Sequence, residues 1–469
     1  MNRNLFLLLG MIVAFFGGCT LAPEYTRPAS PVPVAWPTGE AYKETKTAAS
    51  APAALELKWQ EFFTDAKLQQ VIRKALNDNR DLRLAALNVE RARALYGIQR
   101  AELFPAVNVI GSENKQRRSF DLVRPGEPRT TEQYSVNLGV TSWEIDFFGR
   151  IRSMKDAALQ EYLATEQGRR SAQISLTSAV ANTYLSLATD LEILKLVKST
   201  LDTQQAAYDL IKRRYEVGLA SELDLRRAQT QVDTTRGDVA RYTQLAAQGE
   251  NALNLLVGSP IPKDLLPIDL SSVSPPKDIF PGISSEVLLR RPDVLQAENL
   301  LKAANANIGA ARAVFFPRIS LTGTIGTASD ELSGLFKAGT GTWSFTPQII
   351  MPIFDARTWS ALDATKVARE IVLTQYEKAI QTAFREAADA LAMRGTVDQQ
   401  VSAQESLVNA VEETHRLANA RYTKGIDSYL SVLDAQRSLY AAQQGLVALR
   451  LVRLTNQVRF YAVLGWGNE

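Results

Sequence analysis

The stretch that decides the fold is RYTKGIDSYLSVLDAQRSLY, at residues 421–440. It lies within a long helical pattern that is interrupted once, at Gly425. Glycine tolerates the left-handed backbone conformation that a helix needs in order to stop and turn. Asp427 or Ser428 can then cap the N-terminus of the next helix. The stretch therefore predicts a helix–turn–helix tip.

Three side chains follow this turn at helical spacing. Leu430, Asp434 and Arg437 are separated by four and three residues, which places them on one face of the second helix. A carboxylate beside an apolar residue at the tip of a long hairpin would suit a constriction.

The same tip occurs earlier in the chain. Residues 214–229 read RYEVGLASELDLRRAQ and align with residues 421–436, RYTKGIDSYLSVLDAQ, at an offset of 207. Farther upstream the offset becomes 212, and it carries Gly97 onto Gly309. The chain is therefore a tandem duplication of roughly 200 residues per copy.

The composition excludes several classes of function. The chain has 469 residues, 46% of them hydrophobic, and a net charge of only +3, which implies no strong attraction to nucleic acid. One His and one Cys argue against structural zinc, disulfides and His-based catalysis. No nucleophile–base pair or metal constellation is evident. We therefore expect no enzyme and no cofactor.

The N-terminus reads as a targeting segment. Residues 1–18 have a basic start and a short apolar run, and they precede Cys19, the only cysteine. This pattern resembles a bacterial lipoprotein signal, which implies cleavage before Cys19 and its acylation; the alternative is a plain secretory signal. Residues 19–58 are proline-rich and predict an extended, lipid-anchored arm. The arm is either a flexible tether or a segment that wraps a neighbouring subunit.

Each repeat is expected to contain one β-hairpin. After each Phe-Pro pair the hydrophobic period changes from the helical value to two, over about ten residues per strand, a length that suits tilted membrane strands. Aromatic residues lie near the strand ends, as in membrane girdles: Trp143, Phe147, Phe148, Trp343 and Phe354. The alternative is a small soluble hairpin. Because small barrels need about eight strands, membrane-spanning hairpins would require oligomerisation.

A long helical hairpin is expected to follow each β-hairpin. Residues 150–217 and 357–424 lack proline, and a continuous helix of that length reaches roughly 100 Å. The alternative is an ordinary antiparallel coiled coil. The expected organisation is a first repeat at 59–265 with a β-hairpin at about 106–146 and a tip at about 217–222, a linker at 266–285, and a second repeat at 286–469 with a β-hairpin at about 318–352 and a tip at about 424–429.

Together these motifs resemble the TolC and OprM family of outer-membrane factors of tripartite, RND-type efflux systems, in its lipoprotein (NodT-like) branch. The resemblance covers nearly all of the mature chain. It rests on the Phe-Pro pairs at 104–105 and 316–317, DFFGR at 146–150, PIFD at 352–355, RRPD at 290–293, RYEVGLAS at 214–221 and LDAQRSLY at 433–440.

The resemblance implies a mostly α-helical protomer with four β-strands and long antiparallel helices. Three protomers would form a twelve-stranded β-barrel in the outer membrane and a twelve-helix periplasmic tunnel. The implied partners are a periplasmic adaptor protein and an inner-membrane RND-type transporter. The implied function is passive conduction of drugs or other small toxic compounds. A conduit for type I protein secretion is the alternative, followed by a structural coiled-coil lipoprotein.

The resemblance also assigns roles to the tips. Leu430 and Asp434 become candidate pore constrictors, with Arg437 as a tethering partner. The first tip differs, because Arg227 stands at the position of Asp434, and Asp224 and Arg227 could instead form an ion pair three residues apart. The turn residues are the candidates for adaptor docking: Gly218, Leu219, Ala220 and Ser221 in the first tip, and Gly425, Ile426, Asp427 and Ser428 in the second.

Overall fold

A computed structural model of the chain describes residues 20–42, 58–277 and 284–465. The expected signal segment and Cys19 lie outside the described residues. The chain divides into two compact units. The first contains Met1–Ala29, Asn88–Thr165 and Gln296–Tyr376, and the second contains Ser30–Leu87, Glu166–Leu295 and Glu377–Glu469.

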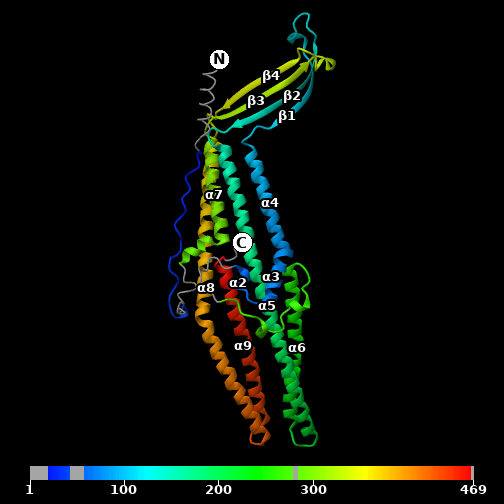
Figure 1. The fold of residues 1–469 in the computed structure, drawn as a ribbon, viewed down its shortest axis with the longest axis vertical. Helices are drawn as coiled ribbons and strands as arrows, with labels where there is room; N and C mark the ends of the chain where they lie inside the picture. Colours follow the sequence, from blue (N-terminus) through cyan, green and yellow to red (C-terminus); the bar gives the residue numbers. More distant parts are fainter. Residues whose placement is uncertain (1–19, 43–57, 278–283, 466–469) are drawn as a thin grey trace. The chain divides into compact units, whose positions relative to one another are not determined.

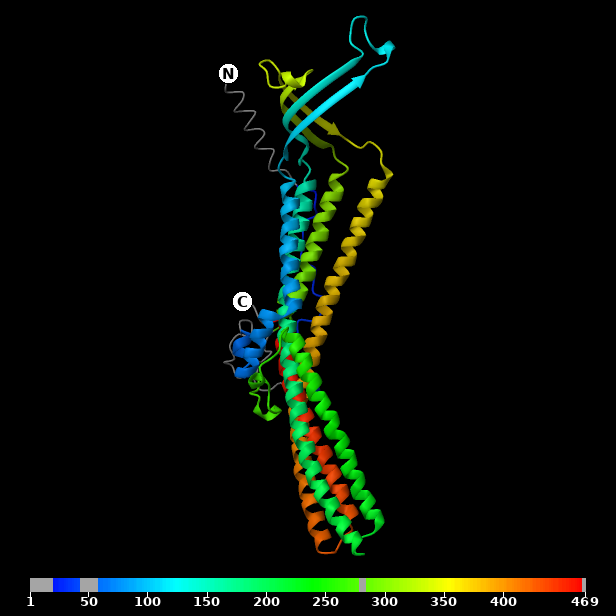
Figure 2. The ribbon, with the colours of Figure 1, turned by 90° about the vertical axis from the view of Figure 1, so that its right-hand side faces the viewer.

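The first unit carries one antiparallel four-stranded sheet in the order β1-β2-β3-β4 (Figures 1 and 2). The strands are β1 (Val107–Arg117), β2 (Thr130–Ile145), β3 (Arg318–Ser329) and β4 (Gly341–Ile350). Each repeat supplies one hairpin, and β2 pairs with β3 to join the two, with a register shift between Val140 and Trp143. The strands β1 and β4 are the two edges of the sheet, so each leaves one row of backbone hydrogen-bonding groups without a partner strand in the protomer.

The aromatic residues at the strand ends do not all behave alike. Trp343 and Phe354 are largely exposed, as a girdle position requires. Phe148 differs, because its ring stacks on Phe316 with 4.8 Å between the ring centroids. Phe148 therefore packs the junction between sheet and helices instead of extending the aromatic belt.

Two long helices pass through both units and turn back in the second. They are α5 (Arg150–Glu216) and α8 (Ala356–Thr423), and the return helices are α6 (Glu222–Val257) and α9 (Tyr429–Val463) (Figure 1). A left-handed glycine follows α5 and α8, and a serine occupies the N-cap position of α6 and of α9. The fold class expected from the sequence is confirmed: the protomer is mostly helical, with four strands and two antiparallel helical hairpins.

The remaining elements are shorter. Helices α4 and α7 each end a few residues before a proline, Pro105 and Pro317. Helix α7 begins at Pro292, because proline is tolerated in the first turn of a helix but not in its interior. These elements are η1 (Glu40–Tyr42), α2 (Trp59–Phe62), α3 (Ala66–Asp78), α4 (Arg80–Ala101), η3 (Phe120–Leu122), η4 (Lys263–Leu265), η5 (Leu270–Ser272), η6 (Ser285–Arg290), α7 (Pro292–Ala313) and η7 (Leu332–Gly334). Among the described residues, no helix has an apolar stretch long enough to cross a membrane.

The second unit has an aromatic core that joins its N-terminal and C-terminal segments. The rings of Phe62 and Tyr461 stack at 5.1 Å, and Phe63 packs edge-on against both. Beside this core, buried Arg291 donates hydrogen bonds to Asp293, Glu386 and the carbonyl oxygen of Val463. The RRPD motif is therefore a helix start whose arginine also binds the C-terminal end of α9.

Gly326 allows β2 and β3 to lie close together, because it has no side chain. A Cβ atom at this position would lie 2.1 Å from the carbonyl oxygen of Val136, and backbone cannot yield as a flexible side chain can. We expect Gly326→Ala to destabilise the sheet by about 1–3 kcal/mol, because the strands must separate locally. The measurement is the thermal loss of β signal in circular dichroism. Gly323→Ala is the control, since its nearest contact is 3.6 Å; equal melting of both variants would contradict the prediction.

Candidate functional site

The two helical tips have the same backbone geometry. At the first tip, Gly218 has a φ of 76° and its N–H donates to the carbonyl of Tyr215. At the second, Gly425 has a φ of 72° and its N–H donates to the carbonyl of Tyr422. Each glycine adopts the left-handed conformation that terminates a helix at little steric cost. The equivalence of the tips in sequence is thus matched in backbone structure.

The side chains cap the two return helices differently. Ser221 accepts a hydrogen bond from the backbone N–H of Asp224 at 3.1 Å, as an N-cap should. At the second tip, Ser428 is the N-cap residue but its side chain accepts no capping hydrogen bond, and Asp427 instead binds Arg421. The prediction that Asp427 or Ser428 would cap α9 through its side chain is therefore wrong. The hydrogen bond from Arg421 lowers the pKa of the Asp427 carboxyl group.

The expected gate residues lie on one exposed face of α9. Leu430 is 39% exposed, and Asp434 and Arg437 are also exposed. Within the described residues the Asp434 carboxylate forms no ion pair; only its backbone oxygen accepts a hydrogen bond, from Ser438. Arg437 does not contact Asp434 but donates from Nε to Oε1 of Gln231 on α6, at 3.2 Å. The geometry leaves Asp434 available to an aqueous passage and places Arg437 against the other hairpin.

The charged pair suggested for the first tip is not formed. Asp224 Oδ2 accepts a hydrogen bond from the hydroxyl group of Ser221 at 2.7 Å. The ion pair close to this tip joins Arg226 to Glu222, one turn apart on α6. Arg227 has no ion-pair partner in the part of the chain that the structure describes. The Asp224 carboxylate is thus engaged by the residue that caps α6.

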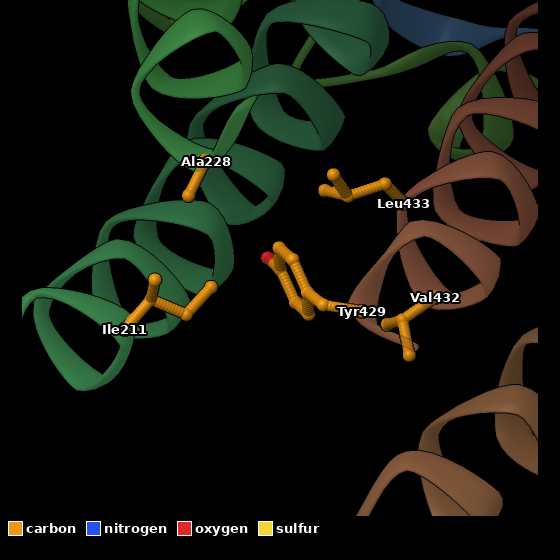
Figure 3. Close-up of a cluster of buried hydrophobic side chains, with 5 residues drawn as sticks. All are labelled: Ile211, Ala228, Tyr429, Val432 and Leu433. Atoms are coloured by element: carbon orange, nitrogen blue, oxygen red, sulfur yellow. The ribbon is translucent and has the colours of Figure 1, made fainter. Parts of the chain in front are cut away.

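A buried apolar cluster holds the two hairpins together just above the tips. Its members come from three helices: Ile211 on α5, Ala228 on α6, and Tyr429, Val432 and Leu433 on α9 (Figure 3). Tyr429 points its ring into the space between the hairpins (Figure 3). Burial raises the pKa of the Tyr429 hydroxyl to about 12, so this side chain stays neutral at any physiological pH.

Two polar contacts across the hairpins were not anticipated from the sequence. Arg214 donates from Nη1 to the hydroxyl of Tyr422 at 2.9 Å and lies over its ring. Farther from the tip, the hydroxyl of Tyr440 donates to Oδ2 of Asp238 at 3.0 Å. The repeat places an Arg-Tyr pair at both tips, but it gives no sign that the arginine of one tip contacts the tyrosine of the other.

The described residues contain no group of three or more His, Cys, Asp or Glu side chains that could hold a metal ion. The chemistry available at the tips is therefore ionic and hydrogen-bonding. Among the described residues, Asp434 and Arg437 are the charges on the face that they share with Leu430, and the Asp434 carboxylate forms no ion pair there.

Comparison with known protein families gives a match over both repeats. The model of a family described as "Outer membrane efflux protein" matches residues 71–259 and 283–466. The toluene efflux pump outer membrane protein TtgC of Pseudomonas putida is 48% identical over 466 residues, covering 98% of this chain and 95% of that protein. The antibiotic efflux pump outer membrane protein ArpC of Pseudomonas putida matches with the same identity and the same coverage.

A solved structure matches over nearly the whole chain. The open state of the Neisseria gonorrhoeae MtrE outer membrane channel is 36% identical, with a TM-score of 0.86, and the match covers 96% of this chain and 98% of that one. The shared fold includes the sheet and both helical hairpins.

The apolar cluster generates a prediction about the tips. We expect Tyr429→Ala to lower the free energy of local opening of the tips by about 3 kcal/mol, because it removes the largest buried side chain of the cluster. Hydrogen exchange at the ends of α5 and α9 should accelerate by about 100-fold. Leu430→Ala is the control, since that neighbouring side chain is exposed. Unchanged exchange in Tyr429→Ala would show that the cluster does not hold the tips.

Proposed function

The chain belongs to the outer membrane efflux protein family, and from this premise we propose that its helical tips form a closable, cation-attracting entrance to an exit duct. The protein is an outer-membrane channel of a tripartite efflux pump, located in the outer membrane and extending into the periplasm. The observation that carries the proposal is the exposed, unpaired carboxylate of Asp434 at the tip.

The sheet calls for assembly, and the family resemblance supplies the number of protomers. A barrel spanning a membrane must satisfy every strand edge, and one protomer leaves β1 and β4 open. The solved structure that this chain resembles is described as an outer membrane channel, and the resemblance to outer-membrane factors implies three protomers around one β-barrel and one helical tunnel. In a homotrimer, β4 of one copy meets β1 of the next, which gives twelve strands in all.

The entrance of such a trimer brings three copies of α9 together. Three Asp434 carboxylates around a narrow aqueous passage attract cations and repel one another, so closure requires counter-ions, water or restraining bonds. The restraining bonds available in each protomer are those from Arg437 to Gln231 and from Arg214 to Tyr422. Leu430, one turn from Asp434, supplies an apolar constriction.

The partners and cargo are proposed from the relatives. The relatives are named for pumps that export toluene and antibiotics, so small, largely apolar toxic compounds are the proposed cargo. An inner-membrane RND-type transporter supplies the energy, and a periplasmic adaptor protein docks at the turn residues 218–221 and 425–428. These turns are exposed and carry glycine at their apex, which leaves their backbone groups accessible. The relatives are channels, so no catalytic activity is proposed.

The N-terminal lipid completes the proposal. Cys19 is the only cysteine and stands directly after an apolar segment with a basic start. Acylation of Cys19 would anchor the chain in the inner leaflet of the outer membrane. Palmitate is the proposed acyl group.

The gate is tested by conductance. We expect Asp434→Ala in planar bilayers to raise the resting conductance about twofold or more and to weaken the preference for potassium over chloride, because the variant removes the charge ring. The purified trimer in detergent is the starting material. Asp224→Ala is the matched control, since that carboxylate lies at the other tip and is held by Ser221. An unchanged current in Asp434→Ala would overturn the gate assignment, and no current from any folded trimer would overturn the channel.

The lipid is tested by labelling. We expect wild-type protein to incorporate radioactive palmitate in a diderm host and Cys19→Ser to incorporate none, because no other thiol is present. Intact mass of the purified chain provides a second reading. Label that persists in the variant would contradict the assignment.

A further inference from the structure

The start of the described chain is bound along one face of α7. Arg312 donates from Nη1 to the carbonyl oxygen of Leu21 at 3.1 Å, and Asn305 donates from Nδ2 to the carbonyl oxygen of Pro23 at 2.7 Å. Residues seven apart lie on one face of a helix, two turns apart. The arm therefore runs antiparallel to α7, with side chains of the helix binding its backbone.

Glu298 lies two turns before Asn305 on the same face of α7 and binds the arm at Arg27. Its side chain is 3% exposed and accepts hydrogen bonds from both the Nε and Nη2 atoms of Arg27, at 3.2 and 2.5 Å. Tyr25 donates to it at 3.3 Å, and Lys302 forms an ion pair with it at 3.0 Å. Burial alone would raise the pKa of Glu298, but the bonds from Arg27 and Lys302 bring that pKa below its usual value. A buried carboxylate compensated by two cations is costly to leave without its partners.

A notch for the arm is made by Gly309. A Cβ atom at this position would lie 2.7 Å from both the Cβ and the backbone nitrogen of Ala22, and 2.6 Å from Oγ of Ser153. Ser153 also hydrogen-bonds the hydroxyl of Thr20 at 3.1 Å. The arm thus enters a space that exists only because residue 309 has no side chain.

The face of α7 opposite the arm carries mainly small side chains. Small side chains, among them Ala303, Ala304, Ala310 and Ala311, line an open groove of about 770 Å³ between α5, α7 and α8. Short side chains supply little apolar contact area. The arm therefore adds hydrogen bonds and an ion pair to the apolar packing of α7, in which Leu301 and Ile308 are buried.

The first repeat shows that this arrangement is not demanded by the fold. At the 212-residue offset, Gly309 corresponds to Gly97 on α4, where a Cβ atom would meet nothing within 4 Å. Glu298 corresponds to Ala86, which can form no ion pair. The notch glycine is common to both repeats, whereas the carboxylate and the bound arm belong to the second alone.

We propose that residues 20–27 are a strap, fastened at Glu298 and seated in the Gly309 notch, that braces α7 and fixes the N-terminus at the sheet end of the helices. Thr20 is bound to Ser153, in the first turn of α5, which begins five residues after the end of β2. The first described residue, Thr20, is consequently held close to the start of α5, and a lipid on Cys19 would be attached one residue before this point. Only this last consequence rests on the proposed acylation; the strap itself does not.

The strap is tested by limited chymotrypsin cleavage after Tyr25 in the folded trimer in detergent. We expect slow cleavage in the wild type and about tenfold faster cleavage in Gly309→Ala and in Glu298→Gln. Alanine is a better helix former than glycine, so Gly309→Ala should release the arm without weakening α7 intrinsically. Gly97→Ala is the matched control and should cleave at the wild-type rate.

Two further readings separate the strap from general unfolding and from the channel proposal. Trimer retention and bilayer conductance should be unchanged in Gly309→Ala, and protection at Tyr25 should persist in Cys19→Ser. Equal cleavage rates in the wild type, Gly309→Ala and Glu298→Gln would overturn the strap. So would equal acceleration in Gly97→Ala, which would indicate a general loss of helix stability. Loss of conductance alone would count against the channel and not against the strap.

Discussion

The structure depends on one constraint: a four-stranded sheet cannot satisfy its own edges. The strands β1 and β4 each expose a row of backbone donors and acceptors, and hydrocarbon offers none in return. Assembly into a closed barrel is therefore a condition of residence in the membrane. Because each strand is followed or preceded directly by a helix, closure of the barrel also arranges the helices in a ring. A duct through the membrane therefore requires hydrogen bonds between the sheets of neighbouring protomers.

The two repeats share one architecture but differ in the side chains at their tips and on their short helices. Both tips use a left-handed glycine and a return helix that begins at a serine. Only the second repeat places a carboxylate at Asp434 and binds the N-terminal arm on its short helix.

At the tips, apolar packing and polar bonds have different roles. The cluster around Tyr429 buries side chains from three helices and supplies most of the cohesion between the hairpins. The bonds from Arg214 to Tyr422 and from Arg437 to Gln231 are partly exposed, so each contributes little net stability. These two hydrogen bonds fix the orientation of one hairpin relative to the other. Water can replace either bond if the hairpins separate.

The sequence by itself determined the duplication, the four strands, the two long hairpins and the exposed face that carries Asp434, because periodicity, proline and glycine act locally. Tertiary structure alone decided which side chains meet. Arg437 binds Gln231, Ser221 rather than Arg227 binds the carboxylate of Asp224, and Asp427 binds Arg421 instead of capping α9. It also seated the arm, which the sequence left as either a free tether or an arm around a neighbour, on α7 of its own chain. Such pairings depend on distances between segments far apart in sequence, and no local pattern encodes those distances.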